Sequence, residues 1–130
     1  KARVLDGWVC ESAFFCAAGL AMLQRTAEAD IVRLRKYKVA IKNVARNLCL
    51  DPALIAAIIS QESRVGRLLD NGWDQSRHKY GLMQFAGQQG QLVGSWDSEE
   101  HINQCSTILV LSINEVRANH PTWTWDRQLR

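Results

Sequence analysis

The stretch that decides the fold is Asp51-Pro52-Ala53-Leu54-Ile55-Ala56-Ala57-Ile58-Ile59-Ser60-Gln61-Glu62-Ser63-Arg64. Asp51 can cap a helix by accepting a backbone N–H, and Pro52 suits the first helical position, where its missing donor would be unpaired anyway. The helix is therefore predicted to begin at this pair. At about 100° per residue, the isoleucines and Glu62 fall on the same side of it.

Glu62 is thus expected in the middle of an apolar helix face. A carboxyl group among isoleucines loses the hydration that its charged form needs, so burial favours the protonated form. A carboxylic acid that stays protonated near neutral pH can give its proton to a leaving oxygen. On spacing alone, the alternative is a Glu near a helix end that turns to solvent or pairs with Arg64.

The motifs that follow favour the catalytic interpretation of Glu62 over the solvent-facing one, because they agree in type, order and spacing with one family. From Asp51 to Leu129 the chain resembles the goose-type lysozymes, and the similarity extends more weakly up to about Asp30. Residues 1–29 match poorly. Besides the helix ending in Glu62-Ser63, the matching motifs are Asn71-Gly72-Trp73, Tyr80-Gly81-Leu82-Met83-Gln84, Gly94-Ser95-Trp96, His101-Ile102, Thr107-Ile108-Leu109 and Pro121-Thr122-Trp123.

The resemblance implies an α+β, predominantly α, lysozyme-like fold, with a small antiparallel sheet beside the helix that carries Glu62. We expect a divergent N-terminal arm at 1–29 and a lysozyme-like domain at 30–130. The sequence ends at Arg130, before the segment and final helix that complete the family's cleft. Without that C-terminal part of the family domain, exposed apolar surface is expected.

The composition is that of a single globular domain with a modest positive charge. A chain of 130 residues can bury roughly two thirds of its unfolded surface. The net charge of +3 favours anionic partners such as bacterial wall polymers, but it is too small to indicate nucleic-acid binding. Arg35, Lys38, Lys42 and Arg46 gather on one helix flank, either as a patch for the anionic wall or simply as a solvated face.

Four cysteines in a short chain are compatible with two disulfides in an oxidising compartment, and three pairings are possible. The resemblance suggests that Cys49 bonds to the N-terminal segment, which holds Cys10 and Cys16. Cys105 has no counterpart in the family pattern and is expected to be a small buried hydrophobe. We therefore expect a secreted, extracellular protein.

The remaining elements follow from periodicity. Residues 12–23 form an uncharged apolar run, too short for the ~20 residues that span a bilayer. A helix from Asp30 to about Cys49 carries a core stripe, and short strands are expected between Trp73 and Gly94. An acidic, capped start at 97–100 opens a helix to Asn119, and Thr122 or Thr124 could open another.

Sugar binding is expected on aromatic faces. The rings of Trp73, Tyr80 and Trp96 could stack on sugars, although such side chains are more often part of the core. Together with these rings, the resemblance implies contacts from Gln84 and Ile108.

A second catalytic carboxylate is missing from the positions where the resemblance would place it. Inverting glycosidases hold two carboxyls about 6.5–9.5 Å apart with a water between them. The positions of the family's auxiliary aspartates are Gln75 and Ala86 here, and neither can act as a base. Asp74, next to the first position, is the candidate replacement, and Asp70 is a more distant one.

Three functions remain open. The first is hydrolysis of the β-1,4 bond between N-acetylmuramic acid and N-acetylglucosamine in peptidoglycan, with Glu62 as general acid. The second is cleavage by Glu62 alone, as in lytic transglycosylases, which resemble this chain in Glu-Ser and Gly-Leu-Met-Gln. The third is an inactive relative that binds wall fragments or a protein. We expect a monomer without cofactor or metal, since the histidines lack a ligand spacing.

Overall fold

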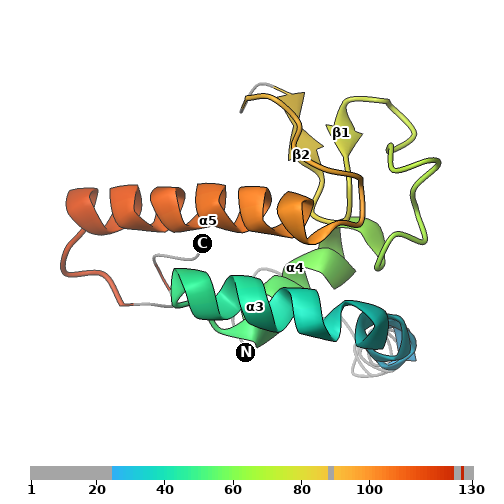
Figure 1. The fold of residues 1–130 in the computed structure, drawn as a ribbon. Helices are drawn as coiled ribbons and strands as arrows, with labels where there is room; N and C mark the ends of the chain where they lie inside the picture. Colours follow the sequence, from blue (N-terminus) through green and yellow to red (C-terminus); the bar gives the residue numbers. More distant parts are fainter. Residues whose placement is uncertain (1–24, 88–89, 125–126, 128–130) are drawn as a thin grey trace, which may run out of the picture.

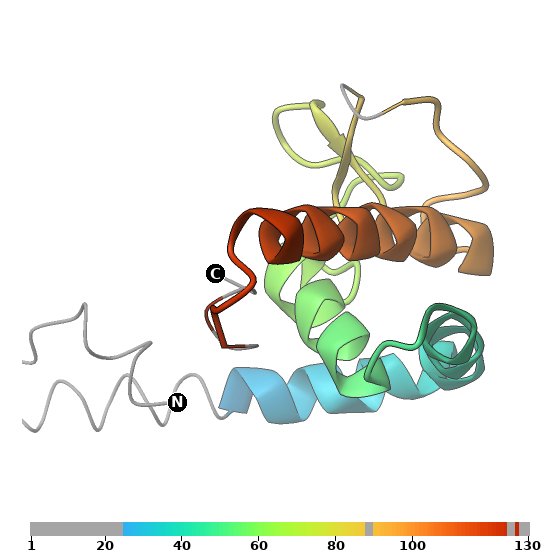
Figure 2. The ribbon, with the colours of Figure 1, turned by 90° about the vertical axis from the view of Figure 1, so that its left-hand side faces the viewer.

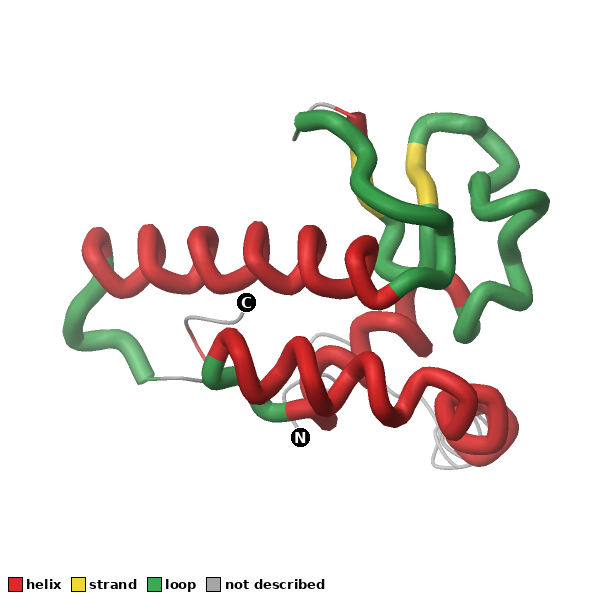
Figure 3. Tube along the Cα trace, in the orientation of Figure 1, coloured by secondary structure: helices red, strands yellow, loops and turns green. Residues whose placement is uncertain are grey.

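The computed structural model describes residues 25–87, 90–124 and 127. Most of these residues are helical, and two short antiparallel strands form a small sheet, so the predicted α+β, mainly α class is confirmed (Figure 3). After a helical segment at 25–34, the elements are η1 (Arg35–Tyr37), α3 (Lys38–Leu48), α4 (Pro52–Ser63), β1 (Lys79–Tyr80), β2 (Phe85–Ala86) and α5 (Glu99–Asn119).

Helix α3 is the element around which the other helices pack, since it contacts both α4 and α5. The two strands and their loops lie on the opposite side of α5 from α3 (Figures 1 and 2). The core forms where these elements meet. Its fully buried side chains come from α3, α4, the turn after β1 and α5, and include Val44, Ile55, Ile59, Leu82 and Ile102.

Helix α4 begins as predicted. The Asp51 carboxylate accepts a hydrogen bond from the backbone N–H of Ala53 at 2.9 Å, and Pro52 occupies the first helical position. The helix ends at Ser63, where Arg64 takes a left-handed conformation with φ 52°. The cap and the proline that begin the helix therefore lie in the local sequence.

The expected burial of Glu62 is wrong. Its side chain is exposed, whereas Ile55, Ile59 and Ser63, four residues apart, are the buried positions of α4. Helix α4 is apolar on most of its surface, so its sequence does not determine which side faces the core. The buried side of α4 passes through Ser63, and Glu62 lies one residue, or about 100°, away from it. The solvent-facing alternative describes its position.

The predicted helix from Asp30 to Cys49 is two helices joined by the 3-10 turn η1. Figure 2 shows the segment 25–34 at a steep angle to α3. The segment 25–34 is anchored by Asp30, which accepts hydrogen bonds from Ser60 and Arg64 at the end of α4. The turn η1 is anchored by Tyr37, whose hydroxyl donates to Asp97 at 3.4 Å. The predicted core stripe is confirmed, since Tyr37, Ile41, Val44 and Ala45 are buried and Leu34 and Leu48 pack beside them.

Helix α5 also agrees with its prediction. The Ser98 hydroxyl accepts from the backbone N–H of His101 at 3.2 Å, and Glu99 and Glu100 occupy the first turn, at the positive end of the helix dipole. Large exposed hydrophobic side chains are spread over several elements of the described ranges: Ile31, Val32, Val39, Leu68, Leu92, Val93 and Leu111. The apolar surface expected from a missing C-terminal segment stays a prediction.

Several predictions fall on residues that the structure does not describe. These are the arm before residue 25 with its apolar run 12–23, Cys10 and Cys16, and most of the helix expected after Thr122. Among the described residues, Cys49 and Cys105 form no disulfide with each other, so a bond from Cys49 to the N-terminal segment stays a prediction. Cys105 is half-buried against the core, and burial raises its pKa to about 12, as suits a structural thiol.

Replacing Asp51 with alanine should lower the free energy of unfolding by about 1 kcal/mol, because the N–H of Ala53 loses its acceptor. An asparagine side chain would still offer an oxygen, so Asp51→Asn is the matched control and should cost clearly less. Urea unfolding followed by circular dichroism measures both. Equal losses in the two variants would mean that the cap is not the source of the effect.

Candidate functional site

The position of Glu62 is set by the residue that follows it. Ser63 is fully buried, and its hydroxyl donates to the backbone carbonyl of Leu82 at 2.8 Å. The same oxygen accepts from the backbone N–H of Gly66 at 3.0 Å. One side chain therefore joins the end of α4, the loop that leaves it and the Gly81–Gln84 turn after β1. Glu62 is the last exposed residue before this junction.

The Asn71-Gly72 pair forms a tight turn. Both residues have positive φ, 49° and 87°, and Asp70 and Trp73 exchange two backbone hydrogen bonds of 2.9 Å. Left-handed φ at both central positions is typical of the turn that matches strand twist. Gly72 must also lack a side chain, since a Cβ there would lie 2.4 Å from Cβ of Trp96.

The turn Gly81-Leu82-Met83-Gln84 connects all parts of the site. Gly81 donates its N–H to Gly72, and Leu82 donates to the carbonyl of Trp96 at 3.0 Å. Within the turn, the Gln84 amide donates to the carbonyl of Gly81 at 2.8 Å. The predicted sugar contact Gln84 thus also closes this turn.

His101 of α5 holds the same turn from the other side. Its side chain is fully buried, and its Nε2 accepts the backbone N–H of Met83 at 3.1 Å. An acceptor at Nε2 requires the neutral imidazole with its proton on Nδ1. Burial lowers the pKa of His101 to about 4, which keeps the ring neutral. Gly81 packs directly on this ring, because an added Cβ would lie 2.2 Å from Cε1.

Trp73 and Tyr80 form an aromatic pair beside the sheet. Their ring centroids are 4.9 Å apart, with an angle of 57° between the planes. Together with Phe85, Ala86 and Leu92 they line an open cavity of about 460 Å³, and the remaining lining residues are Arg77, His78, Lys79 and Gly87. Trp96 differs from these two rings, because it packs against the core, between Gly66 and Gly72.

The Asp74 carboxylate is used within its own loop. It accepts from the Ser76 hydroxyl at 2.6 Å and from the backbone N–H groups of His78 and Lys79 at 3.0 and 3.1 Å. The hydrogen bond from Ser76, followed by that from Lys79, lowers the pKa of Asp74 below its usual value. A carboxylate with a lowered pKa is a weaker base, and this one is bound to the loop on both oxygens.

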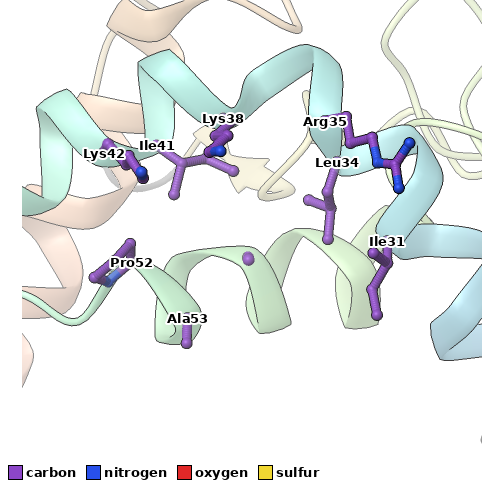
Figure 4. A pocket seen from close by; sticks show the side chains of 9 residues that line it. Ile31, Leu34, Arg35, Lys38, Ile41, Lys42, Pro52 and Ala53 are labelled. Atoms are coloured by element: carbon purple, nitrogen blue, oxygen red, sulfur yellow. The ribbon is translucent and has the colours of Figure 1, made fainter.

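A second cavity, of about 250 Å³, lies at the other end of α4. Figure 4 shows Ile31, Leu34 and Ile41 facing Pro52 and Ala53 across it, with Arg35, Lys38 and Lys42 along one side. Three of the four cations predicted as a patch therefore border an apolar hollow. About ten residues, or roughly 15 Å of helix, separate Pro52 from Glu62. None of the predicted site residues lines this cavity.

The structure brings together only part of the predicted set. Trp73 and Tyr80 line the larger cavity, whereas Glu62, Asp74, Gln84 and Ile108 are not among its lining residues. Ile108 is half-buried on α5. The roles of Ser63 and His101 were missed, although both stand in the motifs that carry the resemblance. The sequence feature that could have indicated these roles is a polar residue inside an otherwise apolar helix face.

No group of three His, Cys, Asp or Glu side chains in the described ranges could hold a metal ion. Nor does any described helix combine the length and apolar character needed to cross a membrane.

With a cluster of helices, a small sheet and a Glu-Ser helix end hydrogen-bonded to the Gly-Leu-Met-Gln turn, the chain has the architecture expected of a lysozyme. The model of the family Lysozyme g matches residues 10–130, and the chain belongs to this family. The match begins upstream of residue 30, and the boundary between arm and domain stays a prediction.

Among its relatives is Lysozyme g of Gallus gallus, 40% identical over 112 residues that cover 86% of this chain and 53% of the relative. Lysozyme g-like protein 2 of Mus musculus is 40% identical over 124 residues, which are 95% of this chain and 58% of that protein. Lysozyme g of Cyprinus carpio is 42% identical over 109 residues, 84% of this chain and 59% of that one. The chain thus spans little more than half the length of these relatives.

Removal of the Ser63 hydroxyl should destabilise the fold by about 1–3 kcal/mol, because it leaves the buried Leu82 carbonyl and Gly66 N–H without this partner. The variant is Ser63→Ala, and Ser112→Ala, at an exposed position of α5, is the matched control. Chemical denaturation measures both. Similar stability of the two variants would show that Ser63 is not a structural tie.

His101 predicts an acid-sensitive stability. The unfolded chain protonates an ordinary histidine below about pH 6.5, whereas native His101 does so only near pH 4. Between these two pH values the unfolded state binds more protons than the native state. The stabilisation that comes from a neutral His101 is therefore complete above pH ~6.5, and the free energy of unfolding falls by roughly 3 kcal/mol as the pH drops toward 4. Urea titrations between pH 4 and 7 should show this slope in the wild type and in the exposed-site control His78→Gln. A His101→Gln variant with the same slope would contradict the assignment.

Proposed function

We propose that the protein is an extracellular glycoside hydrolase that cleaves the β-1,4 bond between N-acetylmuramic acid and N-acetylglucosamine in bacterial peptidoglycan, with Glu62 as general acid. The observation that carries the proposal is the hydrogen bond from Ser63 to Leu82, which fixes the Glu62 helix end to the turn that also positions β1 and β2. Membership of the Lysozyme g family supports the substrate class.

The exposure of Glu62 changes how the acid would work. Burial by isoleucines no longer supports its role, so the proposal requires the bound sugar chain itself to exclude water from the carboxyl. Exclusion of water by substrate strengthens electrostatic interactions in a site and favours a neutral acid over its charged form. The open side of α4 leaves room for a polymer to cover Glu62, since its neighbour Gln61 is exposed as well.

The second carboxylate distinguishes hydrolysis from the alternative reaction. A hydrolase that inverts or retains configuration uses two carboxyl groups, but Gln75 and Ala86 occupy the expected positions and Asp74 is bound to its own loop. This arrangement favours, as a second candidate, lytic-transglycosylase-like cleavage by Glu62 alone, in which the sugar's own hydroxyl closes an anhydro ring. If the protein is inactive, the aromatic cavity would still make it a peptidoglycan-binding relative.

The catalytic proposal is tested by Glu62→Gln. Glutamine keeps the shape of the side chain but cannot donate a proton, so lysis of purified peptidoglycan should fall by at least about 100-fold. Release of labelled fragments measures the rate, and Glu115→Gln, which makes the same change at an exposed position of α5, should leave it nearly unchanged. Equal rates for Glu62→Gln and wild type would remove Glu62 from the mechanism.

Mass spectrometry of the products separates the two reactions. Hydrolysis leaves a reducing end, whereas an anhydro product is lighter by one water. We expect the reducing product and, if Asp74 supplies the base, its loss in Asp74→Asn. Anhydro products from the wild type would establish the second reaction in place of hydrolysis. An absence of any product, combined with retained binding to peptidoglycan, would identify an inactive binding relative.

A further inference from the structure

We propose that Arg77, His78 and Lys79 form a basic rim that makes the aromatic cavity select a sugar bearing carboxylates over an uncharged sugar. In the polymer of the proposed function, on which this inference rests, that ligand is the muramic acid unit with its lactyl group and peptide carboxylates. The rim would thus determine which of the two alternating sugars sits beside the sheet.

The floor of the cavity suits the flat face of a sugar ring. Trp73 and Tyr80 contribute half-buried rings, and Phe85, with 2% of its surface exposed, closes the bottom. Tyr80 is further fixed by an edge contact with the buried ring of His101, at 6.2 Å between centroids. Rigid aromatic surfaces with small ordering costs are well suited to stacking.

The edge of the cavity carries positive charge without a lining carboxylate. Arg77, His78 and Lys79 are consecutive and exposed, and no Asp or Glu is among the lining residues. Arg77 pairs with Asp70 at 3.1 Å, but both side chains are largely in water, where such a pair contributes little. Within the described part of the chain, the ammonium group of Lys79 has no ion-pair partner. An oxyanion could therefore bind at this edge.

Asp74 gives this rim a defined shape. Its carboxylate accepts the backbone N–H groups of His78 and Lys79, and its own N–H donates to the carbonyl of Lys79 at 3.1 Å. Arg77 takes a left-handed φ of 60° within the same loop. A loop held in this way loses less conformational freedom when a ligand binds. Asp74 is in this view a positioning residue for the rim.

The basic surface beside the smaller cavity does not offer the same combination. Arg35, Lys38 and Lys42 border that cavity, whose lining is aliphatic and contains no aromatic ring. Of these two cavities, only the one beside the sheet has both a stacking surface and a cationic edge. Basic residues of α3, which do not line the aromatic cavity, can therefore serve as matched controls for the rim.

The test is binding to three defined ligands, measured by calorimetry with the Glu62→Gln protein so that no cleavage interferes. The ligands are a GlcNAc-MurNAc-peptide fragment with free carboxylates, the same fragment with all carboxylates converted to amides, and a GlcNAc oligomer of equal length. Arg77→Gln/Lys79→Gln removes two rim charges. Lys42→Gln/Arg46→Gln removes the same two residue types from α3, outside this cavity.

We expect the acidic fragment to bind about tenfold more tightly than its amidated form, as for a charge-assisted contact that is partly exposed. The rim variant should lose this preference, the α3 variant should keep it, and added salt should weaken it. The inference is overturned if the acidic and amidated fragments bind equally to the wild-type rim, if the α3 variant loses the preference as well, or if none of the ligands binds.

The binding test of the rim and the activity test of Glu62 can fail independently of each other. Catalysis by Glu62 is judged from fragment release, in which the rim is intact, and selection by the rim is judged from binding, in which Glu62 is absent. A protein that cleaves peptidoglycan but shows no preference for carboxylates would overturn only the inference. A protein that keeps the preference without cleavage would overturn only the enzymatic proposal.

Discussion

The hydrogen bonds that converge on the Gly81-Leu82-Met83-Gln84 turn are the constraint on which the rest of the structure depends. Leu82 accepts from Ser63 of α4, Met83 donates to His101 of α5, and Gly81 donates to Gly72 of the preceding turn. The strands of the sheet are only two residues long, and so short a hairpin is marginal by itself. The sheet is therefore held by polar contacts to buried groups on two helices.

This constraint explains why a glycine, Gly81, packs directly against His101. Gly81 has φ 84° and packs against the His101 ring at a distance that excludes a side chain. The ring in turn must be neutral, because its buried Nε2 is an acceptor. A single buried hydrogen bond, from the Met83 N–H to His101 Nε2, thus sets the separation between α5 and the turn. The ring of Tyr80 contacts the same His101 ring and is positioned by it.

Local signals predicted most of the fold. The caps of α4 and α5 and the α3 core stripe depend on residues close in sequence, and they were found as expected. The bend at η1 and the exposure of Glu62 could not be predicted in this way, because both depend on partners far along the chain. Asp30 binds residues of the α4 end, and α4, apolar on most sides, takes its orientation from α3. In the candidate site, the position of Trp73 and Tyr80 at a cavity could be predicted from the sequence. The hydrogen bonds of the Asp74 carboxylate to its own loop could not.

Asp74 shows how one side chain limits the chemistry available to the rest. A carboxylate that accepts three hydrogen bonds from its own loop is held in its ionised form, and using it as a base would require breaking contacts that shape residues 76–79. The same contacts create a loop with three basic side chains at the edge of an aromatic cavity. The Asp74 carboxylate is thus engaged by its own loop, which leaves the basic side chains exposed at the edge of the cavity. Under the two proposals, recognition of charge by this loop and proton donation by Glu62 would be separable, because the loop and α4 are different elements, and the turn at Leu82 links α4 to the sheet.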